Sequence, residues 1–398
     1  MRKLIYLDNN ATTQVHPEVA EIMDYCLTEC FGNPSTIYSF GKKAKRLMDE
    51  SREKIAKMIN AASDEIVFTS GGTEADNLAI FGIAKANRDK GKHIITSKIE
   101  HHAIINSCKA LEKDGSEITY LDVDKYGIVN LEQLERSIKR ETILISIMHA
   151  NNEIGTIEPI AEIGRIARKH KIYFHSDTVQ AVGKIRVDLK EMNLDMASIS
   201  SHKIHGPKGV GALYVKKGTR IKPILYGGEQ EHRLRAGTEN VPGIAGFGRA
   251  IELAVGEMEK EAAKLSQLRD KLQKGLSERV KYIIFNGHPT ERLPNTINCA
   301  IQFIEGESLI LKLDDLGICA STGSACSSAS LEPSHVLLAI GLAHEAAHGS
   351  LRLSLGRDTT DEDIDYVLDV LPKAVEELRA FSPPYKEFLR KRGLITKA

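Results

Sequence analysis

The chain has 398 residues, in which 54 Lys and Arg balance 54 Asp and Glu, with six Cys and no Trp. The zero net charge argues against a protein that binds nucleic acid or an anionic membrane over a broad face, and the sparse cysteines exclude a disulfide scaffold and indicate reduced thiols. No run reaches the roughly 18–20 apolar residues of a membrane span, and the N-terminal MRKLIYLDNNATT is not a signal peptide, so we expect a cytoplasmic protein.

Short β-rich runs alternate with amphipathic helical stretches along the first part of the chain. The β-rich runs are 65–70, 93–97, 117–121, 143–148, 171–177, 196–200 and 211–215. Several are nearly all apolar, which is typical of strands buried on both faces. Helical candidates between them include 74–89, 102–113 and 160–169. The alternation predicts an α/β fold with a mostly parallel seven-stranded sheet and helices on both faces.

The pattern changes near residue 240. Residues 241–277 read as one long charged helix, and a smaller α+β unit follows it. That unit would contain the segments ESLILKLDDL, SLRLSL and DEDIDYVLDVLPKAVEELRAF. We expect a large domain at 15–258 and a small domain made of 1–14 and 259–398.

Chemically capable residues follow five of the predicted strands. They are Gly72 and Thr73; His101 and His102; His149, Asn151 and Asn152; Asp177 and Gln180; and His202, Lys203 and His205. Ligands of open α/β sheets bind beyond the carboxyl ends of the strands. One such residue would be unremarkable, but five strand ends at one sheet edge predict a site.

Three of these features suit a pyridoxal phosphate (PLP) enzyme. A lysine such as Lys203, crowded at a sheet edge, can bind a carbonyl group covalently. A buried Asp177 can hold a pyridine nitrogen protonated, and Gly72 with Thr73 at a helix N-terminus suits a phosphate. The alternative is a metal site built from His101, His102, His202 and His205. We expect no metal, because no carboxylate completes that set.

Two further features lie in the C-terminal part of the chain. Residues 320–330 are all Ala, Ser, Thr, Gly or Cys, which predicts a mobile loop around Cys326. Cys326 is either a nucleophile or an incidental thiol of that loop, and the other five cysteines are expected to pack in the structure. Arg352 alternates with leucines in a strand-like run, so it can clamp a carboxylate or form a surface ion pair.

The chain resembles the cysteine desulfurases of the NifS/IscS group, which are fold-type I PLP enzymes related to class V aminotransferases. The resemblance runs from YLDNNATT to DEDIDYVLDVL, nearly the whole chain. The motifs that carry it are FGNPS, FTSGGTEADNLAI, EHHA, MHANNEIG, HSDTVQAVGK, SSHKIHGPKGVGALYV, RAGTEN, GSACSSASLEPSHVL and SLRLSLGR.

The resemblance implies the role of each matched residue. Lys203 binds PLP covalently, His101 stacks over its ring and moves protons, Asp177 pairs with the ring nitrogen, and Cys326 receives sulfur. The remaining matches bind the cofactor or the substrate. They are Gln180 at the ring oxygen, Gly72, Thr73, Ser200 and His202 at the phosphate, Thr238 at the phosphate of the other subunit, and Asn152 and Arg352 at the substrate carboxylate.

The resemblance also implies the reaction and the partners. A homodimer would remove sulfur from L-cysteine, giving L-alanine and a persulfide on Cys326, and donate the sulfur to an iron–sulfur scaffold or another acceptor. Cys326 could then contact an iron–sulfur cluster transiently. The alternatives are selenocysteine lyase, another PLP-dependent lyase or aminotransferase, and a sulfur-relay scaffold without enzymatic activity.

Overall fold

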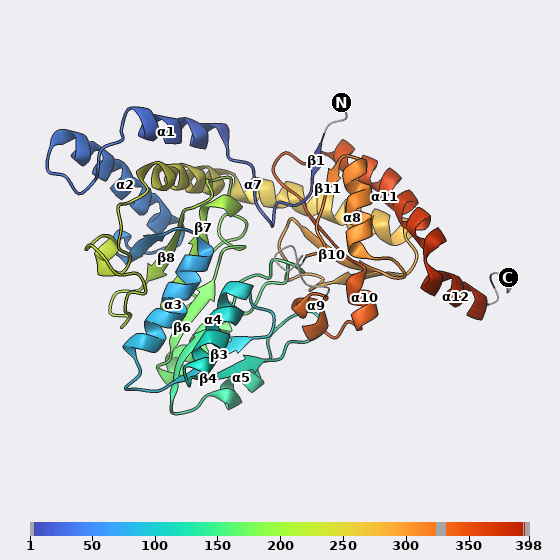
Figure 1. Cartoon of the computed structure of the whole chain (residues 1–398), viewed down its shortest axis with the longest axis horizontal. Coiled ribbons are helices and arrows are strands. Elements are labelled where there is room, and N and C mark those ends of the chain that lie inside the picture. Colours follow the sequence, from blue (N-terminus) through green and yellow to red (C-terminus); the bar gives the residue numbers. More distant parts are fainter. Residues whose placement is uncertain (1–3, 324–331, 393, 395–398) are drawn as a thin grey trace.

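A seven-stranded sheet forms the centre of the larger part of the molecule (Figure 1). The computed structural model describes residues 4–323, 332–392 and 394. The strands are β2 (Ile66–Thr69), β3 (His93–Ser97), β4 (Glu117–Leu121), β5 (Thr142–Ser146), β6 (Tyr173–Asp177), β7 (Met196–Ser200) and β8 (Gly211–Val215). Their order is β2-β8-β7-β6-β5-β3-β4, and β8 runs antiparallel to both neighbours while the other pairs are parallel. The predicted mostly parallel sheet is therefore confirmed.

Helices cover both faces of this sheet, because its strands carry apolar residues on both sides. The helices of this part are α1 (Pro17–Thr28), α2 (Ser39–Met58), α3 (Gly72–Ala86), α4 (His102–Lys113), α5 (Leu131–Ser137) and α6 (Ile160–His170). Val67, Ile94 and Leu144 pack with α3 and α4 in one cluster. Their neighbours Phe68 and Ile145 point to the opposite face and pack with α2 and α6. The strand period of two thus divides the core into two layers.

The helix predicted at 74–89 has different bounds in the structure. It begins at Gly72 and ends at Ala86. It ends early because the Asn87 side chain donates to the carbonyl oxygens of Ile83 and Arg220, at 3.0 Å each. The contact with Arg220 comes from a distant part of the chain and has no signal in the local sequence.

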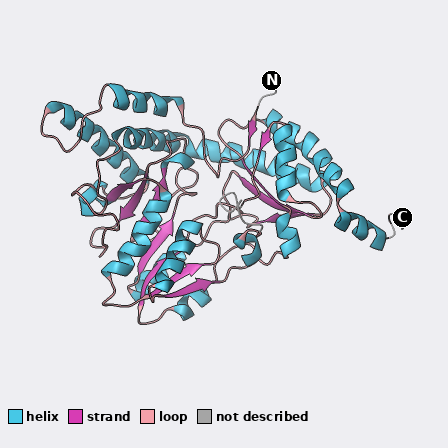
Figure 2. Cartoon of the chain, in the orientation of Figure 1, coloured by secondary structure: helices cyan, strands magenta, loops and turns pink. Residues whose placement is uncertain are grey.

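The smaller part contains a three-stranded antiparallel sheet and a parallel strand pair. The sheet has the order β12-β10-β9, and the pair is β1-β11. These strands are β1 (Ile5–Tyr6), β9 (Ile283–Asn286), β10 (Thr296–Ile301), β11 (Ile318–Cys319) and β12 (Ser350–Ser354). The helices are α8 (Gly306–Asp315), α9 (His335–Ala339), α10 (His344–His348), α11 (Asp361–Phe381) and α12 (Pro383–Lys391). Figure 2 shows this mixture of helices and strands beside the larger sheet.

The long helix α7 (Val241–Arg279) joins the two parts, as predicted. Phe247 and Ile251 near its start belong to the core of the larger part. Leu265 and Leu272 belong to a separate core, together with Ile5 of β1. The two cores are separate, and the division into a large domain at 15–258 and a small domain made of 1–14 and 259–398 stays a prediction. Within the described part of the chain, no helix has the length and apolar character needed to cross a bilayer.

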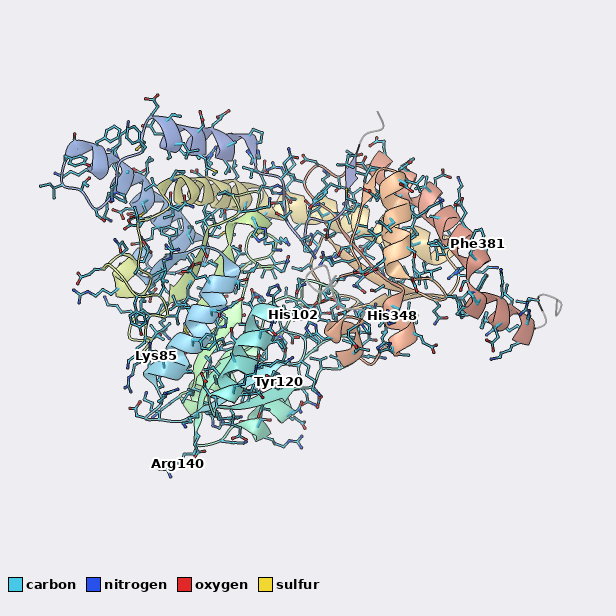
Figure 3. All side chains as sticks on the ribbon, viewed as in Figure 1. Lys85, His102, Tyr120, Arg140, His348 and Phe381 are labelled. Atoms are coloured by element: carbon cyan, nitrogen blue, oxygen red, sulfur yellow. The ribbon has the colours of Figure 1, made fainter. Side chains whose placement is uncertain are left out.

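The two-layer core predicts unequal effects for two phenylalanines. Phe174 of β6 is 0% exposed, whereas Phe381 (labelled in Figure 3) is 83% exposed. Phe174→Ala should lower the free energy of unfolding by about 3–5 kcal/mol, because it leaves a cavity in the core. Phe381→Ala, the control, should change it by less than about 1 kcal/mol. Urea unfolding followed by circular dichroism measures both, and equal losses would contradict this description of the core.

Candidate active site

A cavity of about 300 Å³ lies at the carboxyl edge of the large sheet. Every predicted site residue that the structure describes lines it, except Thr238. These residues are Gly72, Thr73, His101, Asn152, Asp177, Gln180, Ser200, His202, Lys203 and Arg352. Five strand ends and a strand of the small sheet therefore contribute to one site.

Among the predicted residues that the structure describes, Thr238 does not line this cavity. Thr238 is exposed on the segment before α7, and its expected contact with a second subunit stays a prediction. Cys326 lies outside the described residues. The described residues Gly323 and His335, which precede and follow it in the chain, both line the cavity.

The remaining strand-end candidates differ in whether they line the cavity. His149 is buried and does not line the cavity, and Asn151 uses its side chain to donate to the Ile99 carbonyl oxygen at 2.9 Å. His102 lies at the start of α4 and lines the cavity (Figure 3), with its ring centroid 4.8 Å from that of His335. His205 lines a second, smaller cavity instead. Among the described residues, no group of three or more His, Cys, Asp or Glu is arranged to hold a metal ion.

Lys203 reaches the cavity from the short helix η2 (Ser201–Lys203), which directly follows β7. Its Nζ donates to the carbonyl oxygens of Asn10 at 2.6 Å and Ala11 at 2.8 Å. Asn10 and Ala11 line the same cavity from the N-terminal segment. The lysine amine is therefore held between the edge of the large sheet and that segment.

Asn10 is a buried junction that the sequence did not identify. It is 1% exposed, and its carbonyl oxygen also accepts from Nε2 of Gln180 at 3.0 Å. Its side chain contacts the small part, because Nδ2 donates to Oγ1 of Thr296 at 2.9 Å and Oδ1 accepts from Asn295 at 3.0 Å. The only local signal is the pair of Asn residues in YLDNNATT. Asn10 thus connects the lysine with both parts of the molecule.

Two buried carboxyl groups, those of Asp76 and Asp177, line the same cavity as Lys203. Asp177, the last residue of β6, accepts from the Val179 backbone N–H at 2.9 Å. Burial raises the pKa of Asp177 to about 6, although that hydrogen bond and the charge of Lys203 lower it. Burial, and then the charge of Asp177, raise the pKa of Asp76 well above its usual value. Within the described chain, Oδ1 of Asp76 accepts no hydrogen bond, and Nε2 of His175 lies 3.7 Å from it, so this oxygen can accept a hydrogen bond from a ligand.

Two of the four histidines that line the cavity, His101 and His202, are held neutral. Burial, and then the charge of Lys203, lower the pKa values of His101 and His202 to about 4. Nδ1 of His101 accepts from the Ala103 backbone N–H at 3.1 Å. The proton of its neutral ring is therefore on Nε2. Nδ1 of His202 lies 3.1 Å from Oγ1 of Thr12.

The N-terminus of α3 forms one wall of the cavity. The first N–H groups of a helix have no partner within it and favour an anion. Gly71 has φ of 151°, a conformation that suits glycine, and a Cβ on Gly72 would lie only 2.9 Å from a Val179 methyl carbon. The two glycines therefore keep this wall open, and Thr73 and Ser200 add hydroxyl groups to the lining.

Arg352 enters the cavity from β12, while Leu351 and Leu353 pack in the small core. Its Nη2 forms an ion pair with Oδ1 of Asp8 at 2.7 Å, and Nη1 donates to the Asn152 carbonyl oxygen at 3.1 Å. It is 2% exposed, so the alternative of a surface ion pair is wrong. Its Nε has no hydrogen-bond partner within the described chain and can donate to a bound carboxylate.

This set of residues fits PLP. The cofactor needs an amine for covalent attachment, a buried carboxylate for its ring nitrogen and an anion site for its phosphate. Lys203, Asp177 and the N-terminus of α3 supply these groups around one cavity. The orphaned oxygen of Asp76 and the open wall at Gly72 also favour a bound ligand. The cavity volume lies within the usual range of about 300–1,000 Å³ for such ligands.

Glu100 gives a direct test of the electrostatics of the site. It is fully buried, accepts from Oγ of Ser97 at 2.6 Å and from the Met148 N–H at 3.0 Å, and lines the cavity. Burial raises its pKa from 4.5 to about 8. The folded protein therefore binds more protons than the unfolded chain between these pH values, so the contribution of Glu100 to stability falls as pH rises.

Replacing Glu100 with Gln should remove this pH dependence. The variant should gain stability relative to the parent as pH rises from about 5 to 8, at up to about 1.4 kcal/mol per pH unit. Unfolding by urea at a series of pH values measures the difference. Glu345→Gln changes an exposed side chain and serves as the control. A stability difference that does not vary with pH would show that Glu100 is not a buried neutral acid.

Comparisons with known sequences place this chain among proteins related to PLP enzymes of the same fold. The family model Aminotransferase class-V matches residues 5–367. A cysteine desulfurase IscS from Methanosarcina thermophila is 58% identical over 96% of this chain and 94% of its own length. A protein of the same name from Dictyoglomus turgidum is 56% identical over 97% of this chain and 98% of its own length.

Solved structures give the same result. A NifS-like protein has a TM-score of 0.89 and 39% identity, covering 94% of this chain and 100% of that chain. A NifS-like protein from Rickettsia africae has a TM-score of 0.85 and 35% identity, covering 94% and 99%. SspA in complex with cysteine has a TM-score of 0.79 and 37% identity, covering 88% and 98%.

Neither the described residues nor these relatives favour a selenocysteine lyase, an aminotransferase or a non-enzymatic sulfur relay. The fold, the site that fits PLP and the 56–58% identity to cysteine desulfurases over nearly the whole chain lead to one assignment. The chain belongs to the aminotransferase class-V family and, within it, to the PLP-dependent cysteine desulfurases.

Proposed function

We propose that the cavity binds PLP and L-cysteine and that its residues transfer the substrate sulfur to Cys326. One observation carries the proposal: Lys203, Asp177 and the N-terminus of α3 line a single cavity. PLP, when bound, supplies an electron sink for the carbon atoms of the substrate. The residues of the chain supply binding, orientation and proton transfer.

Lys203 would hold the cofactor, and its amine would take the proton from the substrate Cα. Its amine is positioned for this by the carbonyl oxygens of Asn10 and Ala11. The carboxylate of Asp177 would pair with the ring nitrogen and favour its protonated form. His101 would contact the ring, and its neutral state lets it accept and return a proton.

Different lining residues would bind the two anionic groups, the cofactor phosphate and the substrate carboxylate. The N-terminus of α3, with Gly72, Thr73, Ser200 and His202, holds the phosphate. Asn152 and Arg352 hold the substrate carboxylate, and the unpaired Nε of Arg352 gives that carboxylate a donor. Gln180 donates to the ring oxygen. Thr238 of a second subunit completes the phosphate site.

The sulfur transfer balances without any external oxidant. The Cys326 thiolate attacks the substrate sulfur, forming an S–S bond while the C–S bond breaks. The electron pair of the C–S bond remains with the substrate Cβ, which takes up a proton. The products are L-alanine and a persulfide on Cys326. The lining residues Gly323 and His335 on either side of this segment support delivery of the thiol to the cavity.

Replacing Lys203 with Ala should abolish both turnover and the yellow absorption of bound cofactor, because the attaching amine is lost. Absorption spectra and an alanine-release assay measure these effects. Lys208→Ala alters an exposed lysine of the same segment and should leave both unchanged. A yellow, active Lys203→Ala variant would refute the assignment of Lys203.

The acceptor role of Cys326 can be read by mass spectrometry. After incubation with L-cysteine without an acceptor, the peptide that contains Cys326 should gain one sulfur atom. Cys326→Ser should carry no added sulfur and should lose desulfurase turnover, whereas Cys319→Ser is the matched control. If alanine forms while residue 326 gains no sulfur, the persulfide step is wrong and the enzyme acts as a lyase.

A homodimer and an external acceptor complete the proposal. Exposed apolar side chains gather on α1, α2 and the segment between them, and such surfaces mark interfaces. They are Leu27, Phe31, Ile37, Tyr38 and Phe40. The persulfide sulfur then passes to an acceptor in the cytoplasm, which we propose to be an iron–sulfur scaffold protein, and Cys326 could contact the assembling cluster transiently.

Sedimentation tests the dimer directly. The parent protein should sediment with twice the 43.9 kDa mass of one chain. Ile37→Glu places a charge on an 88% exposed side chain of the proposed interface and should weaken association. Leu311→Glu changes a 69% exposed leucine on α8 and should not. A monomeric parent protein would contradict the role of Thr238.

A further inference from the structure

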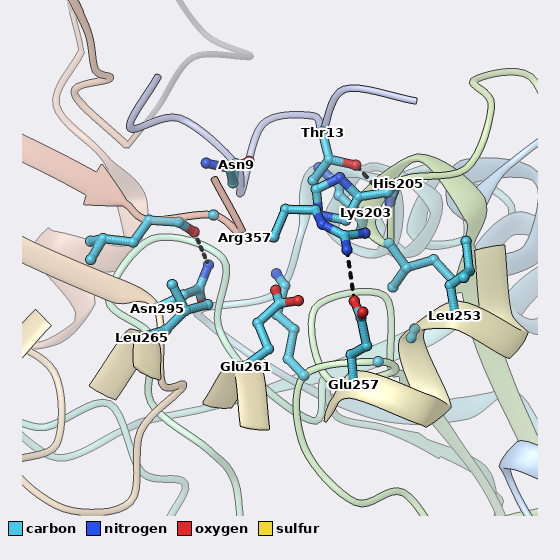
Figure 4. A pocket seen from close by; sticks show the side chains of 16 residues that line it. Asn9, Thr13, Lys203, His205, Leu253, Glu257, Glu261, Leu265, Asn295 and Arg357 are labelled. Atoms are coloured by element: carbon cyan, nitrogen blue, oxygen red, sulfur yellow. Dashed lines mark hydrogen bonds and ion pairs between the residues drawn. The ribbon is translucent and has the colours of Figure 1, made fainter. Parts of the chain in front are cut away.

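Lys184 is a second lysine close to the site. Lys203, Glu261 and Arg357 (labelled in Figure 4) line a small cavity of about 40 Å³, and Lys184 lines the same cavity. It does not line the larger cavity in which the reaction takes place. Its four-residue spacing from Gln180 nevertheless lets its amine reach a residue that lines the larger one.

The contacts of Gln180 fix the orientation of its amide group. Nζ of Lys184 donates to Oε1 of Gln180 at 2.6 Å, and Nε2 of Gln180 donates to the Asn10 carbonyl oxygen at 3.0 Å. Lys184 offers only donors and the carbonyl offers only an acceptor. The two contacts therefore agree on one orientation of the amide, with Oε1 toward Lys184 and Nε2 toward the Asn10 carbonyl oxygen.

The hydrogen bond to Asn10 alone would fix the orientation of the Gln180 amide less firmly than both contacts together. The same carbonyl oxygen accepts from Nζ of Lys203 at 2.6 Å, so two donors share it. Nζ of Lys184 also lies 3.3 Å from the Asn10 side-chain Oδ1. Lys184 thus contacts both Gln180 and the residue that positions it.

We propose that Lys184 is a positioning residue that fixes the Gln180 amide with its NH₂ group toward the cofactor. This inference rests on the proposed contact of Gln180 with the cofactor ring oxygen. One N–H of Nε2 bonds to Asn10, and the other is available to that oxygen. A flipped amide would present Oε1 to the ring oxygen, and two acceptors would then face each other.

The positioning contact does not depend on the charge of Lys184. Burial, and then the charges of Lys203 and Arg352, lower the pKa of Lys184 to about 7, while Glu261 raises it. A neutral amine still has two N–H donors and a charged one has three. The hydrogen bond to Gln180 is therefore available in both states, and the proposal predicts no switch with pH.

The test measures cofactor affinity by absorption titration of the apoprotein with PLP. Lys184→Met keeps the length of the side chain without the donor and should weaken binding about tenfold, the typical effect of losing one such hydrogen bond. Gln180→Ala should weaken it by a similar factor. The double variant should bind no more weakly than Gln180→Ala alone, since Lys184 acts through Gln180.

Two controls accompany these variants. Lys190→Met changes an exposed lysine nearby and should bind PLP like the parent. Lys184→Arg restores a donor, for which the small cavity provides room, and should recover affinity to within about threefold of the parent. Circular dichroism establishes folding, and Lys184→Ala replaces the Met variant if that variant does not fold.

Three results would overturn the inference, and they are distinguishable. Unchanged affinity in Lys184→Met, with weakened binding in Gln180→Ala, would show that Lys184 does not position the amide. A double variant weakened by the product of both factors would show that the two residues act independently. Unchanged affinity in Gln180→Ala would refute the proposed Gln180 contact itself, and the inference with it.

Discussion

The arrangement of the site depends on the backbone carbonyl of Asn10, which accepts hydrogen bonds from both Lys203 and Gln180. This carbonyl is buried, so its two donors replace water that cannot reach it. The residues before Asn10 pack into the small core, where Ile5 and Leu7 are buried. The position of Lys203 therefore depends on the packing of a different part of the molecule.

The charges of the chain sum to zero. Several of the charged and titratable side chains lie together around the cavity. Buried carboxyl groups at Asp76, Glu100 and Asp177 lie near the cations Lys203 and Arg352. Burying a charge is costly unless it is paired, so groups in such a site change their protonation state. Burial raises the pKa values of the acids and lowers those of the histidines. The proposed ligands, a zwitterionic substrate and a dianionic phosphate, would meet charged groups that the fold already holds in place.

The sequence predicted the elements well where the signal was local. Strands 93–97, 117–121 and 196–200 match to the residue, because apolar runs and periodicity are properties of the segment itself. The carboxyl-edge rule also placed most of the strand-end candidates in one cavity. The missed residues act across the chain: Asp8 pairs with Arg352, 344 positions away, and Asn10 bonds to Asn295, 285 positions away. No pattern within a window of sequence carries such contacts.

The proposed function requires that Lys203, and not another lysine, binds the cofactor. Lys184 is the informative rival, since its Nζ lies 3.3 Å from Oδ1 of the same Asn10. Only Lys203 of these two lines the larger cavity. Treating the purified protein with borohydride fixes the cofactor to the lysine that holds it, and peptide mass mapping then identifies that lysine. The cofactor mass should appear on Lys203, and finding it on Lys184 or on no lysine would contradict the proposed role of Lys203.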